Sequence, residues 1–166
     1  MYHALIGQMQ KQLKHLDKWL EAATNHAKER KFEPDNFLQA RLVVDQLPLL
    51  RQVQTACDTL KLSAARLSGK EAPKHDDSEK TIDELRTRIR STLEWVASVS
   101  EADLAQAATR TITTPRWQGK SMSGADYFLE HALPNFYFHV THVYALLRHN
   151  GVSIGKRDYL GQLSLR

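Results

Sequence analysis

The sequence predicts an all-α protein, a four-helix bundle with a short β-hairpin or ribbon before the last helix. Two observations predict this class. Long stretches carry apolar residues at alternating steps of three and four, which places those residues on one face of a helix. The connections between the stretches have ordinary lengths, so the helices can pack around a shared core. The chain of 166 residues is long enough for one such domain, covering positions 1–166.

Three long helices are predicted in the first hundred residues. The first covers residues 2–30, and the second covers residues 36–67. The second is expected to bend at Pro48, because proline removes a backbone donor and crowds the preceding turn. The third helix follows Thr81 and Glu84, which have the spacing of a capping box.

A β-hairpin or ribbon is predicted between residues 109 and 124, where β-branched residues cluster and Pro115 limits strand pairing. The last long helix then covers residues 124–151. Pro134 falls inside its pattern, so we expect a kink near residues 130–134. The core face of this helix is expected to consist of Leu129, Leu133, Phe136, Val140, Val143 and Leu147. Residues 154–166 are expected to dock back onto the bundle.

Charge and composition indicate a mixed, solvated surface. The chain carries 23 basic and 19 acidic residues, a formal net charge of +4, and the two signs are interspersed. No basic run alternates with aromatic residues, so nucleic acid is not expected as a partner. The one cysteine, Cys57, lies on an apolar stripe, which predicts a buried thiol in a reducing compartment. No segment has the pattern of a signal peptide or membrane span, so a cytoplasmic protein without membrane contact is expected.

Polar residues accompany the apolar stripes of the second and last helices. Arg41, Asp45 and Gln52 form a line beside the predicted core face, and Asn135 and His139 lie one turn apart on the flank of the last helix. One interpretation is an exposed intrahelical pair and a buried structural histidine, hydrogen-bonded to Asp45 and Gln52. The other is a pocket between the two helices, lined by Arg41, Asp45, Gln52, Asn135, Tyr137 and His139.

Several strings in the chain resemble an uncharacterised bacterial family. The most specific are LPNFYFH at 133–139 and LLRHNGV at 146–152. That family is a domain of unknown function, usually placed in the DinB/YfiT-like superfamily of four-helix bundles. The resemblance covers nearly the whole chain and implies the same bundle fold.

The resemblance also implies positions for a metal site. Members of the superfamily often bind a divalent metal through one histidine on the second helix and an HxxxH pair on the last, and several are thiol-dependent transferases. The corresponding residues in this sequence are Gln52, Asn135 and His139. Carboxamides are weak ligands for zinc, nickel or iron, so one strong ligand is left where such a metal needs three. No cofactor is therefore expected, and a divalent metal at His139 is kept as the alternative.

Three functions are compatible with these observations. The preferred hypothesis is a protein without demonstrable activity that binds an unknown small molecule between the second and last helices. The first alternative is a metal-dependent, thiol-transferase-like enzyme that uses His139. The second is a non-catalytic structural or interaction protein. A homodimer is expected, because Ile6 and Trp19 leave apolar side chains outside the core stripe of the first helix.

Overall fold

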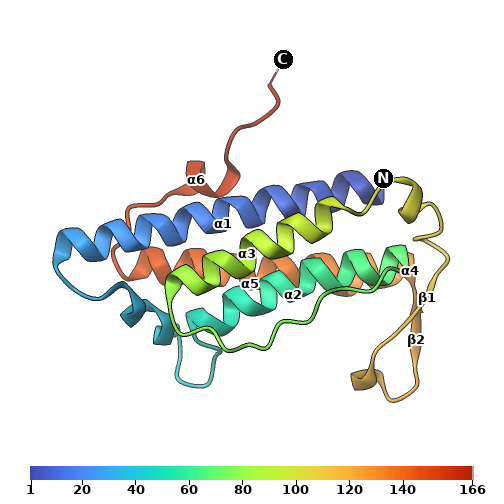
Figure 1. Cartoon of the computed structure of the whole chain (residues 1–166), viewed down its shortest axis with the longest axis horizontal. Helices are drawn as coiled ribbons and strands as arrows, with labels where there is room; N and C mark the ends of the chain where they lie inside the picture. Colours follow the sequence, from blue (N-terminus) through green and yellow to red (C-terminus); the bar gives the residue numbers. More distant parts are fainter. Residues whose placement is uncertain (166) are drawn as a thin grey trace.

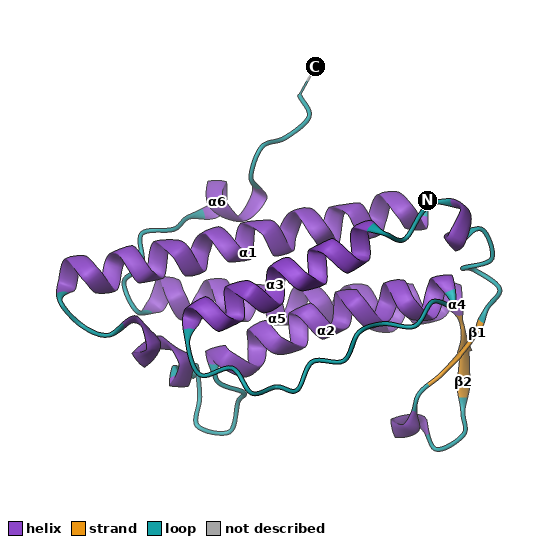
Figure 2. Cartoon of the chain, viewed as in Figure 1, coloured by secondary structure: helices purple, strands orange, loops and turns teal. Residues whose placement is uncertain are grey.

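The framework of the protein is a bundle of four long helices. A computed structural model describes residues 1–165. The long helices are α1 (Tyr2–Arg30), α2 (Leu49–Ser68), α3 (Ile82–Ala97) and α5 (Leu133–His149), and they run along the long axis of the molecule (Figure 1). Helix α2 packs against α3 and α5, and α1 closes the bundle by packing against the same two helices. The expected all-α bundle is confirmed, and helix dominates the chain (Figure 2).

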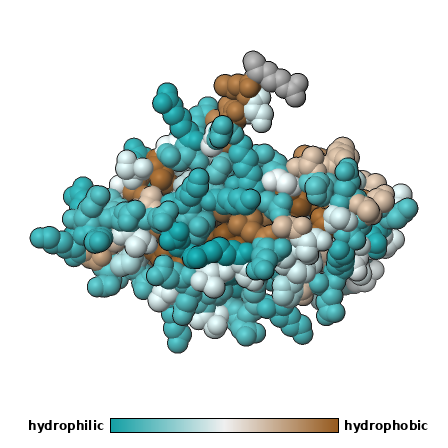
Figure 3. Space-filling view, turned by 45° about the horizontal axis from the view of Figure 1, so that its top comes forward, coloured by the Kyte–Doolittle hydropathy of each residue, from teal (hydrophilic) through white to brown (hydrophobic). Residues whose placement is uncertain are grey.

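The core lies between the predicted apolar stripes. Leu13, Leu16 and Leu20 of α1 are fully buried, as are Val140 and Val143 of α5. Cys57 is also buried, as its place on the apolar stripe of α2 predicts. Most of the face seen in Figure 3 is hydrophilic, with small hydrophobic areas between the polar side chains. Within residues 1–165, no helix is both long enough and apolar enough to cross a bilayer.

The second long helix begins later than its pattern predicts. A short 3₁₀ helix, η1 (Pro34–Gln39), is followed by an irregular exposed segment, and α2 begins at Leu49 with Pro48 as its N-cap residue. The predicted helix over 36–67 is therefore wrong at its start, and Pro48 does not bend α2. The physical reason is that proline disfavours helical geometry in the residue before it, so Pro48 ends the irregular segment and starts a new helix.

A long loop and a capping box connect α2 to α3. The chain from Gly69 to Thr81 runs back along α2 before α3 starts (Figure 1). The hydroxyl of Thr81 accepts a hydrogen bond from the backbone N–H of Glu84, and the carboxylate of Glu84 accepts one from the backbone N–H of Thr81, both at 3.1 Å. This is the capping box expected from the sequence. A short 3₁₀ turn, η2 (Ala102–Leu104), follows α3.

A β-hairpin precedes the last helical segment, as predicted. Strands β1 (Thr111–Thr113) and β2 (Ser121–Ser123) pair in an antiparallel register, with Ile112 opposite Met122. Between them lies η3 (Pro115–Trp117), a 3₁₀ turn near the tip of the hairpin. Pro115, two residues after the end of β1, explains why the strands are so short, since proline has no N–H for the ladder.

The irregularity expected at Pro134 is a stretch of π-helix. A short helix, α4 (Gly124–Asp126), continues into the π-helical segment η4 (Tyr127–Ala132) and then into α5. The N–H of Leu133 donates to the carbonyl of Phe128, which belongs to the wider π-helical turn. This wider turn rotates the side chains preceding α5. Leu129, expected on the core face, is 67% exposed, whereas Tyr127 and Phe128 are buried.

Of residues 154–166, expected to dock on the bundle, the structure describes all but the last. The chain beyond residue 162 leads away from the bundle, with Leu163 and Leu165 exposed (Figure 1). Residues 154–162 pack on α1. They form a short helix, α6 (Lys156–Leu160). The indole N–H of Trp19 donates to the carbonyl of Asp158 at 3.3 Å, and the ring of Trp19 stacks on Tyr159 with centroids 5.5 Å apart. These contacts cover Trp19, and Ile6 is also buried, so the expectation that these two residues lie outside the core is wrong.

Candidate functional site

Gln52 and His139 face each other between α2 and α5. Both side chains are buried, and Nδ1 of His139 lies 2.7 Å from Oε1 of Gln52. The amide nitrogen of Gln52 donates to the carbonyl of Leu47 at 3.0 Å, which leaves the amide oxygen facing the imidazole. Since an amide oxygen can only accept, Nδ1 of His139 carries the proton. Burial, with a smaller contribution from His142, lowers the pKa of His139 to about 4, so the ring is neutral at pH 7.

Asn135 bonds to a different part of α2. Its amide nitrogen donates to the hydroxyl of Thr59 at 2.8 Å, and that hydroxyl donates to the carbonyl of Thr55 at 2.7 Å. Thr59 lies two turns beyond Gln52 on α2, whereas Asn135 lies one turn before His139 on α5. Each of the two α5 side chains therefore has its own partner.

Three residues expected to line a pocket with His139 lie elsewhere. Arg41 and Asp45 are in the exposed segment before α2, where Nη1 of Arg41 donates to the carbonyl of Gln46 at 2.5 Å. They do not continue the polar line of α2 because that helix begins only at Leu49. Tyr137 is hydrogen-bonded to Gln8 of α1, and burial raises the pKa of its hydroxyl.

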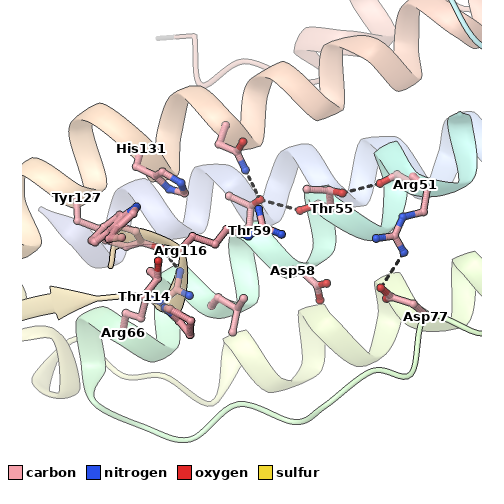
Figure 4. A pocket seen from close by; sticks show the side chains of 14 residues that line it. Arg51, Thr55, Asp58, Thr59, Arg66, Asp77, Thr114, Arg116, Tyr127 and His131 are labelled. Atoms are coloured by element: carbon pink, nitrogen blue, oxygen red, sulfur yellow. Dashed lines mark hydrogen bonds and ion pairs between the residues drawn. The ribbon is translucent and has the colours of Figure 1, made fainter. Parts of the chain in front are cut away.

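A pocket of about 400 Å³ opens between α2, the hairpin and the segment leading into α5 (Figure 4). Asn135 is the one residue of the expected set on its wall. The pocket is lined by Arg51, Thr55, Asp58, Thr59, Leu62, Arg66, Asp77, Thr114, Pro115, Arg116, Trp117, Tyr127, His131 and Asn135. Arg51 and Asp77 lie at one end in Figure 4, and Arg66, Tyr127 and His131 lie at the other.

Each charged side chain at the Arg51 end has a partner of opposite charge. Nη1 of Arg51 lies 2.8 Å from Oδ2 of Asp77, and the buried Arg88 of α3 lies 2.8 Å from Oδ1 of Asp77 and 2.9 Å from Oδ1 of Asp58. Lys61 lies 3.0 Å from the same oxygen of Asp58. Burial opposes ionisation of Asp77, but the hydrogen bonds from Arg51 and Arg88 outweigh it and lower its pKa. These side chains already have partners and hold the wall of the pocket together.

The hairpin end of the pocket combines two arginines with aromatic rings. Arg66 donates to the hydroxyl of Tyr127 at 2.9 Å. The ring of His131 stacks on Tyr127, with centroids 5.5 Å apart, and meets Trp117 edge-on at 5.9 Å. Within residues 1–165, neither Arg66 nor Arg116 forms an ion pair. Burial and the positive charges of these two arginines lower the pKa of His131.

The family of the chain follows from two comparisons. A family described as a domain of unknown function (DUF1993) matches residues 1–160. The chain belongs to the DUF1993 family. A crystal structure of a DinB family member protein from Shewanella denitrificans is 50% identical, covers 97% of this chain and 92% of that chain, and superimposes with a TM-score of 0.93. The expected relationship to an uncharacterised DinB-like family is confirmed at this level. Comparison with curated proteins gives no match.

In this DUF1993 protein, the three positions that the resemblance assigns to a metal do not fit one. Gln52 already accepts from His139, and Asn135 is bonded to Thr59. Only His139 among them is a strong ligand for zinc, nickel or iron. Within residues 1–165, no three or more His, Cys, Asp and Glu side chains are grouped so that they could hold a metal ion.

Sequence reasoning missed most of the pocket wall. Arg66 lies far from Arg116 and His131 in the chain, and no regular spacing connects the three residues. A weak local signal existed in Pro115-Arg116-Trp117, where a cation and an indole follow a threonine-rich stretch. From the sequence, that string was interpreted only as part of the hairpin with Pro115 limiting its pairing, because its partners on α2 and η4 are set by tertiary packing.

Proposed function

We propose that this DUF1993 protein binds a small molecule in the pocket between α2, the hairpin and the η4–α5 segment. The observation that carries the proposal is the state of Arg66 and Arg116, which line the pocket yet form no ion pair within residues 1–165. Buried charges are ordinarily paired, as Arg88 is here, whereas the half-buried Arg66 has the hydroxyl of Tyr127 as its partner and Arg116 extends the positive charge to the exposed rim. Convergent polar groups in a concave, partly apolar site are typical of ligand binding.

The size and composition of the pocket support this proposal. A volume of about 400 Å³ lies in the range that small-molecule sites occupy. Thr55 and Asn135 supply hydrogen-bonding groups along one wall, and Trp117 supplies an aromatic surface at the other end. The proposed ligand therefore contacts both a polar and an aromatic part of the wall.

A blocked pocket tests the proposal. Thr55→Trp places an indole in the space, and Thr87→Trp is the matched control, because Thr87 is an exposed helical threonine whose hydroxyl bonds the carbonyl four residues earlier in the same way. Both variants are compared with the wild type by ligand-detected NMR against a fragment library. We expect to find fragments that bind the wild type and the control but do not bind Thr55→Trp. A library whose binders are unaffected by Thr55→Trp would contradict the proposal.

The alternative of a metal-dependent transferase requires His139 to act as a ligand. Its Nδ1 proton is directed at Gln52, and the neighbouring Asn135 is engaged with Thr59, so the surroundings of His139 support a structural role. The test is metal analysis of protein purified without a histidine tag. Stoichiometric zinc, nickel or iron that disappears in His139→Ala would establish the alternative.

Self-association is a second proposal, based on a different surface. Leu42, Val43, Val44 and Leu47 are exposed in the segment before α2, and Val44 is 94% exposed. Gln46 of this segment lies 2.6 Å from Nε2 of His142, whose ring packs on the half-exposed Phe138 of α5. The exposed apolar residues of the segment thus continue onto α5, and a second copy would cover them. Light scattering that gives the monomer mass of 19.0 kDa at micromolar concentration would count against a homodimer.

A further inference from the structure

We propose that the ligand of this pocket is a small aromatic acid, with its carboxylate between Arg66 and Arg116 and its ring against Trp117. This inference rests on the proposed function and specifies its chemistry. It concerns the hairpin end of the pocket, with Arg66, Arg116, Tyr127 and His131 on its wall (Figure 4). Trp117 lies beside Tyr127 and His131.

The charge of the lining residues selects an anion. Three arginines and two aspartates line the pocket, and both aspartates are already paired with Arg51, Lys61 or Arg88. The remaining positive charge therefore lies on Arg66 and Arg116. A guanidinium group presents several N–H donors in one plane and suits a carboxylate, to which it can donate two parallel hydrogen bonds.

Arg66 is held in place before any ligand arrives. Its Nη1 donates to the hydroxyl of Tyr127, and that hydroxyl is also 3.3 Å from Oγ of the buried Ser63. The guanidinium carbon lies 5.6 Å from the centroid of the Tyr127 ring. Because this contact restricts the arginine, less side-chain freedom is lost when the other donors of Arg66 engage an anion.

The aromatic part of the ligand is indicated by the residues around the arginines. Trp117 meets both Tyr127 and His131 edge-on, at 6.1 Å and 5.9 Å between centroids, and Pro115 and Leu62 complete the apolar part of the wall. Trp117 is half-buried, so part of its surface is left for a further contact. Aromatic rings prefer such stacked or edge-on neighbours, which favours a planar ring over a flexible aliphatic chain.

The pKa of His131 should report whether an anion is bound between the two arginines. The groups that face it are the cations Arg66 and Arg116 and the rings of Tyr127 and Trp117. Burial and these two cations lower the pKa of His131 in the free protein. A carboxylate placed between the cations offsets their charge, so its binding should raise the pKa of His131.

The experiment uses benzoate as the probe and the full chain as the protein. Titration followed by ¹H–¹⁵N NMR should show benzoate binding at the hairpin end with a dissociation constant of about 1 mM, and the ring signals of His131 should report a raised pKa. Arg66→Gln is expected to weaken binding about tenfold, and the more exposed Arg116→Gln about threefold. Arg30→Gln, in the last turn of α1 at the far end of the bundle, is the matched control and should leave binding unchanged (Figure 1).

Three further probes separate the possible outcomes. Benzamide tests the charge, butyrate tests the ring, and inorganic phosphate tests whether any anion suffices. If benzamide binds as tightly as benzoate, the ligand need not be an acid, and only the proposal of small-molecule binding remains. If butyrate or phosphate binds as tightly as benzoate, the inference that the ligand contains an aromatic ring is wrong. Absence of shifts with benzoate up to about 10 mM would overturn the inference, and the Thr55→Trp comparison then decides separately whether the pocket binds other molecules.

Discussion

Replacing His139 by alanine tests whether this histidine is a neutral, structural residue of the core. At pH 7 the substitution removes the hydrogen bond to Gln52 and leaves the buried amide oxygen of Gln52 without its donor. Such a loss costs about 1–3 kcal/mol of the free energy of unfolding. Urea denaturation followed by circular dichroism measures this difference.

The pH dependence of this difference in the free energy of unfolding is the more stringent test. The pKa of His139 is about 4 in the folded protein, whereas the ordinary value for histidine is 6.5. Between these two pH values the unfolded chain therefore binds a proton that the folded one does not. Stability from this histidine is therefore fully present above pH 6.5 and is lost as the pH falls. At about 1.4 kcal/mol per pH unit, the wild type loses about 2 kcal/mol between pH 6.5 and pH 5 through His139. The alanine variant cannot lose this contribution, so its deficit should shrink by that amount.

Subtracting the variant from the wild type isolates His139. Burial also lowers the pKa of His15, His75 and His131, and these residues contribute to the decline of both proteins alike. His3→Ala, at an exposed position of α1, is the control and should leave the stability almost unchanged at each pH. A deficit of His139→Ala that is the same at pH 7 and pH 5 would refute the assignment of a neutral, buried imidazole.

Three other substitutions or modifications test the core. Arg88→Ala should lower the free energy of unfolding by about 3–5 kcal/mol, because it removes a cation that is paired with carboxylates at the pocket wall. Arg90→Ala, on the exposed face of the same helix, should have little effect, and equal urea midpoints for the two variants would contradict this prediction. Gly124→Ala should cost about 3 kcal/mol, since an added Cβ would lie 1.8 Å from the carbonyl oxygen of Ala107, and a wild-type melting temperature would show that the backbone gives way easily. Burial raises the pKa of Cys57 to about 12, so its thiol should react with Ellman's reagent only in denaturant, and rapid reaction of the native protein would be inconsistent with that burial.

The helices that local patterns determine were predictable from the sequence. Helix α1 needs only its own apolar spacing, and α3 needs its spacing plus the Thr81–Glu84 capping box. The hairpin was predictable from its β-branched residues, and Pro115 indicated that its pairing would be limited. In each case the deciding interactions join residues a few positions apart, so the relevant physics is local.

Two wrong predictions show where local sequence patterns fail to give the structure. The segment before Pro48 carries helical spacing, but proline disfavours helix in the residue before it, and the chain is irregular there instead. Leu129 fits the apolar stripe of a regular α-helix, but the π-helical segment η4 turns it to solvent and turns Phe128 inward. A periodicity argument assumes one constant helical period, and these segments do not keep it.

The candidate site also has a part that was predictable from the sequence and a part that was not. The sequence by itself determined that Gln52 and His139 are polar residues beside apolar stripes, and helix packing brings them to 2.7 Å. The pocket around Arg66, Arg116 and His131 was decided by tertiary structure alone. Its chemistry depends on which charges are left without a counter-charge, and that is set by the folded neighbours of each side chain. Arg51 and Arg66 lie on the same helix, yet Asp77, carried by the loop along α2, forms an ion pair with Arg51 and not with Arg66.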